Sequence, residues 1–330
     1  MKYDERSYFE LKLYFNATHE EPKITEELTE LVTETVSEGN LKEISEESLV
    51  SDKKTEGETN EKISSESFRN TITRVAFKWS KLSNVPNEIF TKFPQLEIFD
   101  GSHINLQNLN SLSFNKAENL LDVFLNNNNL KNINSYVFVH LKKLETLDLS
   151  FNNIQVVHLF AFNGLDSLQS LDLSQNKISN LDDSTFLPLK NLNSIWLDRN
   201  RLKVISSYLF TEVNDQLERI SMNRNSISVI SPKVFDRLKN LQFLHLNGNE
   251  CISKSFVNHV IQENVSIKME LRSCFKNYRK NFLNEIEEIN LELQLKELKN
   301  ATVVCGAYLL IYNDLIENYE SQIEEFEKRG

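Results

Sequence analysis

The sequence predicts an α/β solenoid, a fold in which one short strand-and-return unit is stacked on copies of itself. Seven phenylalanines stand at equal intervals, with a single slightly longer step at the end, and six asparagines repeat in phase with them. Spacing this regular indicates stacked repeats rather than unrelated amphipathic segments. The phenylalanines are Phe90, Phe114, Phe138, Phe162, Phe186, Phe210 and Phe235.

Each repeat carries the pattern L-x-x-L-x-L-x-x-N-x-L, and about eight copies predict about eight parallel strands. One copy consists of Leu144, Leu147, Leu149, Asn152 and Ile154. Apolar residues that alternate through the centre of the pattern predict a half-buried strand. The Asn amide both donates and accepts, so it is expected to satisfy backbone groups of the turn after the strand. The Phe is expected to stack into a buried spine.

The composition divides the chain into four parts. Residues 1–68 hold 18 acidic and 8 basic side chains and predict an acidic, largely disordered arm, because few apolar residues offset the entropy of the chain. Residues 69–250 contain the repeats, residues 251–274 are expected to cap them, and residues 275–330 are expected to form a helical tail. The arm is either an interaction segment or a solvated spacer.

Three cysteines bear on the cap and the tail. Cys251 stands where the last repeat should have its final apolar residue, and Cys274 ends the cap segment, so a disulfide is expected to close the loop between them. A short helix is expected within this loop, in residues 253–264. Cys305 lies on the apolar seam of the tail, where it is either an interchain bridge or a small buried side chain.

The tail predicts a coiled coil. Its apolar residues recur at alternating steps of four and three from Leu291 to Phe326, which is heptad spacing. A helix with such a seam has to cover it. Residues 291–326 are therefore expected to pair with another chain, as a homodimer or heterodimer, or to fold back on themselves or on the cap.

Two sets of signals point to different compartments. The chain is charged from its second residue and shows no apolar signal-peptide core, and no run reaches the ~18 apolar residues of a membrane span, which favours a cytoplasmic protein. The expected disulfide and three glycosylation sequons, at Asn16, Asn264 and Asn300, favour secretion. We expect a secreted protein whose coding start is incomplete.

The repeats resemble the typical class of extracellular leucine-rich repeat proteins. The cap motif LNGNECISKSF…LRSCF at 246–275 resembles the C-terminal end of short secreted insect proteins of this type. A solenoid followed by a heptad helix with a seam cysteine is similar to the mosquito leucine-rich repeat immune proteins. That resemblance implies disulfide-linked pairing through the coiled coil and a role in innate immunity.

The strand side chains that do not point inward line the concave face of such a solenoid. Protein interfaces are enriched in aromatic and arginine side chains, so a patch around Trp196 is the expected binding centre. The alternative is an ordinary surface covered by neighbouring side chains. The candidate binding residues are Phe124, Asp148, Phe151, Asp172, Trp196, Asp198, Arg199, Arg219 and Arg224.

The functional class expected is binding without catalysis. The sequence contains no catalytic or phosphate-binding motif, and its six histidines show no metal-ligand spacing. Asp148 and Asp172 are expected side by side on adjacent strands, either as a solvated pair or as an acid–base or Ca²⁺ site. The sequence contains no stripe of lysine and arginine that would neutralise phosphates, so nucleic-acid binding is not expected. The net charge of −11 comes mostly from the arm.

We therefore expect a module with no cofactor or metal that binds a protein or a glycan on its concave face. The alternatives are an intracellular scaffold and an extracellular matrix or adhesion protein, because a solenoid of this kind does not by itself specify a ligand.

Overall fold

A computed structural model describes residues 72–78, 82–257 and 265–278, the single residues 70 and 280, and the backbone of residues 10–14. The chain divides into two compact units, Met1–Tyr278 and Arg279–Gly330. The rest of the acidic arm, the heptad seam 291–326 with Cys305, and the sequons at Asn16, Asn264 and Asn300 lie outside the described residues.

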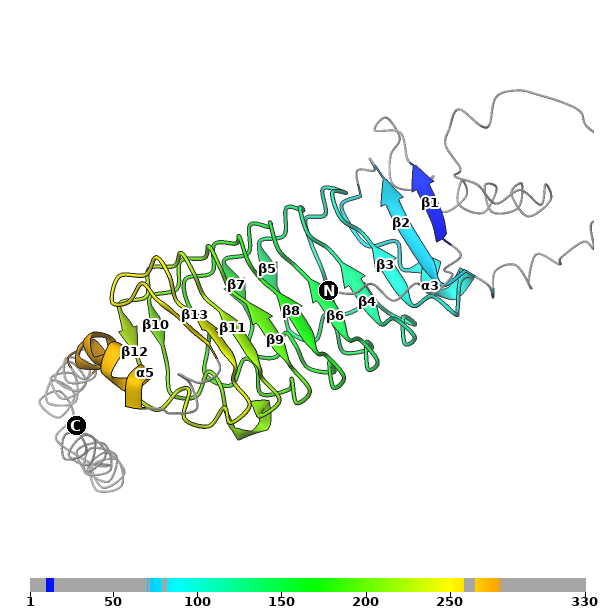
Figure 1. The fold of residues 1–330 in the computed structure, drawn as a ribbon. Helices are drawn as coiled ribbons and strands as arrows, with labels where there is room; N and C mark the ends of the chain where they lie inside the picture. Colours follow the sequence, from blue (N-terminus) through cyan, green and yellow to red (C-terminus); the bar gives the residue numbers. More distant parts are fainter. Residues whose placement is uncertain are drawn as a thin grey trace, which may run out of the picture. The chain divides into compact units, whose positions relative to one another are not determined.

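One short strand from each repeat joins a single parallel sheet, with the strands side by side in chain order (Figure 1). The strands are β2 (Arg74–Lys78), β3 (Ile98–Asp100), β4 (Asp122–Phe124), β6 (Thr146–Asp148), β8 (Ser170–Asp172), β9 (Ser194–Trp196), β11 (Arg219–Ser221) and β13 (Phe243–His245). Each strand is connected to the next by a returning arm, so the chain forms stacked coils. The predicted solenoid is confirmed.

The sheet is longer than predicted, because a further strand pairs at each end. Strand β1 (Glu10–Tyr14) is parallel to β2, and β14 (Ser255–Val257) is antiparallel to β13. The prediction of a helix within residues 253–264 is wrong at residues 255–257, which form β14. An edge strand presents unpaired N–H and C=O groups, and a strand laid against it satisfies them where a helix would not.

The returning arms contain little regular structure. Two pairs of very short parallel strands lie there, β5 (Asn132–Ile133) with β7 (Val156–Val157) and β10 (Val204–Ile205) with β12 (Val229–Ile230). Short helical turns are α3 (Glu88–Lys92), the 3₁₀ turn η3 (Glu212–Asn214) and α5 (Val265–Glu270). The turn η3 lies between Phe210 and Ile220, in the repeat that is slightly longer than the others.

The core lies between the sheet and the returning arms. In the main sheet, the central residue of each strand from β4 to β13 is fully buried, whereas most of its neighbours in the strand are only partly buried. In β3 the large side chain of Phe99 takes extra space. The next inward position is therefore Gly101, where an added Cβ would stand 2.8 Å from the Phe99 ring. A coil buries its apolar face only against its neighbours, so stability is shared along the stack.

The repeated asparagines form a buried hydrogen-bond ladder, as predicted. The Asn176 Oδ1 accepts the backbone N–H of Ile154 from the preceding coil at 2.9 Å. The Asn176 Nδ2 donates to the carbonyls of Leu149, at 3.0 Å, and Leu173, at 3.1 Å. The same contacts recur at Asn128, Asn152, Asn200, Asn225 and Asn249. Each amide therefore joins two successive coils at the end of their strands.

The phenylalanine spine is confirmed from Phe90 to Phe210. Successive ring centroids along it are 5.7 to 6.5 Å apart, and all six side chains are buried. The prediction is wrong for Phe235, which is only partly buried. Phe235 lies in the last coil with a returning arm of this kind. Within the described residues, no further coil stacks over its ring.

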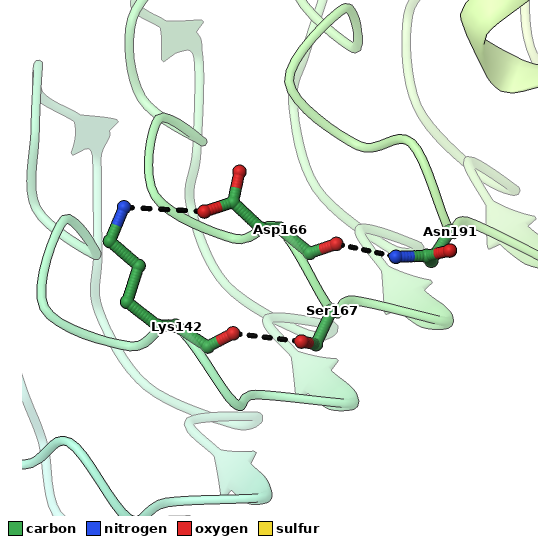
Figure 2. A network of polar contacts seen from close by, with 4 residues as sticks. All are labelled: Lys142, Asp166, Ser167 and Asn191. Carbon is green, nitrogen blue, oxygen red and sulfur yellow. Dashed lines mark hydrogen bonds and ion pairs between the residues drawn. The ribbon is translucent and has the colours of Figure 1, made fainter.

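A second polar ladder, which the repeat pattern does not predict, joins the coils just before their strands (Figure 2). The Ser167 Oγ donates to the carbonyl of Lys142 at 2.8 Å, and the Asn191 Nδ2 donates to the carbonyl of Asp166 at 2.7 Å. The Lys142 Nζ lies 3.2 Å from the Asp166 Oδ2. These groups are exposed, so their contribution to stability is small compared with that of the buried ladder.

The cap closes the C-terminal end of the core. Cys251 and Cys274 form a disulfide with Cα atoms 5.1 Å apart. Helix α5 and the helical residues 272–278, which include Cys274, belong to this end, and Ile267, Leu271 and Phe275 bury their side chains there. The Ser273 Oγ donates to the carbonyl of Cys251 at 2.9 Å, so the cap is joined to the last coil by polar as well as covalent bonds.

Candidate binding surface

Four columns of side chains run across the strands on the face of the sheet opposite the core. Two of them are formed by the first and third residues of each main-sheet strand from β3 to β13, and the other two by the second and third residues after each of these strands. The register places Phe124, Asp148, Asp172 and Trp196 opposite one another on β4, β6, β8 and β9. Strand partners in a sheet are about 4.8 Å apart. The structure therefore brings these four candidates together as one continuous row, with a carboxylate pair between two aromatic rings.

Phe151 stands in the column at the turn after the strands. Its backbone φ is +53°, and its side chain is 48% exposed. Residues at the equivalent position in other coils share this left-handed conformation; they are His103, Asn127, Gln175, Arg199, Arg224 and Gly248. All of these except Phe151 are polar or glycine. A bulky apolar side chain is unusual in this conformation, which costs an L-residue roughly 1–2 kcal/mol.

The three candidate arginines lie toward the C-terminal half of the sheet. The Arg219 guanidinium lies 4.7 Å from the centroid of the Phe243 ring. Arg199 and Arg224 are exposed, and both have φ of +53°. Two long cationic side chains therefore stand at the same turn position of adjacent coils, and Trp196, on the strand before Arg199, is partly buried.

The aspartates of this face are held by local hydrogen bonds. The backbone N–H of Ser150 donates to the Asp148 Oδ1 at 2.9 Å, and that of Ser174 donates to the Asp172 Oδ1 at 2.7 Å. The Asp198 Oδ1 accepts from the Ser221 Oγ at 2.7 Å. Burial raises the pKa of the Asp172 carboxyl, and the charges of Asp148 and Asp198 act in the same direction, whereas the bonds from Ser174 oppose the rise.

A shallow hollow of about 460 Å³ lies at the turn side of this surface. Its lining is rich in amide side chains around Phe151, with His103, Asn127 and Gln175 on the same column. Amides both donate and accept hydrogen bonds, and an aromatic ring offers an apolar surface. This combination is suited to holding a polar ligand or a peptide surface against the sheet.

A family profile described as leucine-rich repeat matches residues 94–154, 143–202 and 190–250. Residues 94–250 are leucine-rich repeats. A search of curated proteins found no match.

Solved leucine-rich repeat structures have a similar fold. In the TLR13–ssRNA13 complex the likeness covers 56% of this chain and 30% of that chain, with 24% identity and a TM-score of 0.50. In the mouse RP105/MD-1 complex it covers 55% of this chain and 31% of that chain, with 21% identity and a TM-score of 0.50. The aligned part is thus about a third of each of those longer chains, and the similarity concerns the fold.

No metal site or membrane-spanning helix is found where the structure is described. Across residues 72–78, 82–257 and 265–278, no three His, Cys, Asp or Glu side chains are grouped to hold a metal ion. No helix in the same described residues is long and apolar enough to cross a bilayer.

One surface feature was missed at the sequence level. Tyr136 and Phe160 lie outside the four columns, 43% and 42% exposed, with their rings stacked at 5.8 Å. Leu112 and Tyr208 stand at the equivalent position of other repeats and are also exposed. The spacing was visible in the sequence, but the buried spine has the same period, so periodicity alone does not tell an inward position from an outward one.

Proposed function

We propose that the concave face of this leucine-rich repeat domain binds a protein partner, with Phe151, Phe124 and Trp196 as contact residues. The observation that carries the proposal is the exposed ring of Phe151 in a left-handed backbone conformation. An exposed ring gains little from burial, and the conformation costs the fold about 1–2 kcal/mol. A role in contact with another molecule accounts for an apolar residue at this position.

The proposed activity is binding rather than catalysis. The candidate residues lie on an open sheet, and the hollow beside Phe151 is shallow. The row of aromatic and charged side chains is typical of protein interfaces, which place buried aromatic anchors among polar groups. A glycan is the second candidate ligand, because the hollow combines Phe151 with amide side chains.

Phe151→Asn tests the proposal. Asn127 adopts a φ of +57° at the equivalent position one coil earlier, so Asn suits this backbone and the variant should keep the stability of the wild type. Phe160→Asn is the matched control, since it removes an equally exposed ring outside the concave columns. Tagged wild-type and variant proteins are compared for the partners they capture from native extracts, identified by mass spectrometry.

We expect the Phe151→Asn protein to lose partners that the Phe160→Asn protein keeps. The proposal is overturned if wild type and Phe151→Asn capture the same proteins to the same extent. The identity of a captured partner also tests the role in innate immunity that the sequence resemblance implies, and arrays of free glycans test the second ligand class.

Secretion and pairing through the tail are further parts of the proposal. The Cys251–Cys274 disulfide supports an oxidising compartment, since cytosolic thiols are kept reduced. Residues 291–326 and Cys305 are proposed to link two chains. Electrophoresis without reductant should then reveal a dimer that Cys305→Ser abolishes. A monomer in both proteins would contradict covalent pairing, and reduced cysteines in protein from cells would favour the intracellular scaffold.

A further inference from the structure

Charge is sorted along the concave face. Within the four columns, strands β4, β6 and β8 carry Asp122, Asp148 and Asp172, and neither these strands nor the turn positions after them contribute a lysine or arginine. On β3, Asp100 is already paired with Arg74 at 3.6 Å. The middle of the sheet therefore presents carboxylates without a neighbouring cation in the columns.

Positive charge prevails on the next two strands, β9 and β11. Arg199, Arg219 and Arg224 follow on the coils of β9 and β11, where Asp198 is the one carboxylate in the columns. The Asp198 Oδ1 accepts from both the Ser221 Oγ, at 2.7 Å, and the backbone N–H of Asn223, at 2.8 Å. The three guanidinium groups thus exceed the carboxylates in this half of the surface.

Two carboxylates of the middle strands are held close together although their charges repel each other. Asp148 and Asp172 are register partners, so two like charges stand about 5 Å apart. The Ser150 and Ser174 N–H groups each hold one oxygen, which orients both carboxylates in the same way. Phe124 and Trp196 flank the pair in the row, and aromatic faces attract cations. A cationic group bound there would relieve the repulsion and contact both rings.

We infer that the concave face binds its protein partner in one orientation, with a basic segment of the partner over β4–β8 and an acidic segment over the arginines of β9–β11. This inference rests on the proposed function and specifies the charge pattern of the partner. The row from Phe124 to Trp196 receives lysine or arginine side chains, and Arg219 and Arg224 receive carboxylates. Complementary charges of this kind steer association and set orientation.

The fluorescence of Trp196 provides a local readout. The chain has two tryptophans, so a Trp79→Phe background leaves Trp196 as the single one. Two probes are titrated into the full-length protein at low salt, a peptide of six arginines and a peptide of six glutamates. The acidic arm is present in every protein compared, so its attraction for the arginine peptide cancels in the ratios.

Two double variants separate the halves of the surface. We expect Asp148→Asn with Asp172→Asn to weaken binding of the arginine peptide about tenfold and to leave the glutamate peptide unaffected. Arg219→Gln with Arg224→Gln should do the reverse. Asp182→Asn with Asp183→Asn, which changes two exposed carboxylates outside the columns, is the control and should match the background for both peptides.

The inference is overturned if the first double variant binds the arginine peptide as the background does, or if both double variants weaken both peptides equally. These outcomes are distinct from a failure of the proposed function. If partner capture needs Phe151 but both charge variants bind the two peptides as the background does, the proposed function stands and the proposed orientation is wrong. If the two double variants affect the two peptides selectively but partner capture does not depend on Phe151, the proposed function fails at Phe151, and only the separation of charge on this face is supported.

Discussion

Replacing a buried ladder asparagine by alanine should be among the most damaging single changes in the solenoid. Asn176→Ala removes the acceptor of the Ile154 N–H, at 2.9 Å, and the donor to the Leu149 and Leu173 carbonyls, at 3.0 and 3.1 Å. A buried donor left without a partner costs about 1–3 kcal/mol, and each carbonyl loses part of its bonding as well. Together these losses give about 3–5 kcal/mol.

The free energy of unfolding in urea tests this prediction, with far-UV circular dichroism as the signal. The slope of the unfolding free energy against urea concentration should be the same in all variants, which shows that compactness is unchanged. Asn129→Ala is the control. Asn129 is the residue after a ladder asparagine and is exposed, with side-chain bonds to Asn105 and Asn153 only, so its removal should change stability by no more than about 0.5 kcal/mol.

Position along the stack provides a second check. Asn249 makes the same contacts as Asn176, but they are only part-buried because no complete coil follows, and Asn249→Ala should cost about 1–2 kcal/mol. An Asn176→Ala protein within about 1 kcal/mol of Asn129→Ala would refute the argument that unsatisfied backbone groups between coils control stability.

Three further changes test other parts of the structure. Replacing Cys251 and Cys274 by serine opens the loop that the disulfide closes, and the urea midpoint should fall by the equivalent of about 3 kcal/mol, an effect that reductant should reproduce in the wild type; a midpoint indifferent to reductant would contradict it. Gly164 has φ of +98°, and a Cβ there would meet the backbone of the preceding coil at 2.6 Å, so Gly164→Ala should lose about 2–5 kcal/mol by the same assay, and near-neutrality would argue against this close approach. Because burial raises the folded-state pKa of Asp172, the ionised carboxyl opposes folding above that pKa and the penalty disappears as the pH falls through it. Asp172→Asn should therefore be more stable than wild type at pH 7, by a margin that narrows at acidic pH, whereas a margin that widens on acidification would be inconsistent with a raised pKa.

The interior coils could be predicted from sequence because each of them has the same neighbours. A leucine or isoleucine at the centre of a strand is buried by the equivalent residue of the next coil, and a ladder asparagine meets the same backbone groups each time. The repeat period therefore predicts the contacts between coils. The strands, the asparagine ladder and the spine up to Phe210 could be predicted from it.

Features at the ends of the stack could not be predicted in the same way. Phe235 carries the sequence signature of the spine, but burial of its ring needs a following coil, and none stacks over it among the described residues. Strands β1 and β14 form because edge strands leave backbone groups unpaired, and the segments that pair with them lie outside the repeat pattern. The segments that cover the two ends of the stack lie outside the repeat pattern, so the repeat period does not identify them.

For the binding surface, the sequence determined which side chains share the concave face, since alternation along a strand assigns each residue to a side. Only the tertiary structure decided their chemistry. The exposure and left-handed backbone of Phe151, and the desolvation of Asp172 beside two other carboxylates, arise from contacts between coils. Exposure and pKa depend on the surrounding atoms in three dimensions, and residues a full repeat away in the chain supply those atoms.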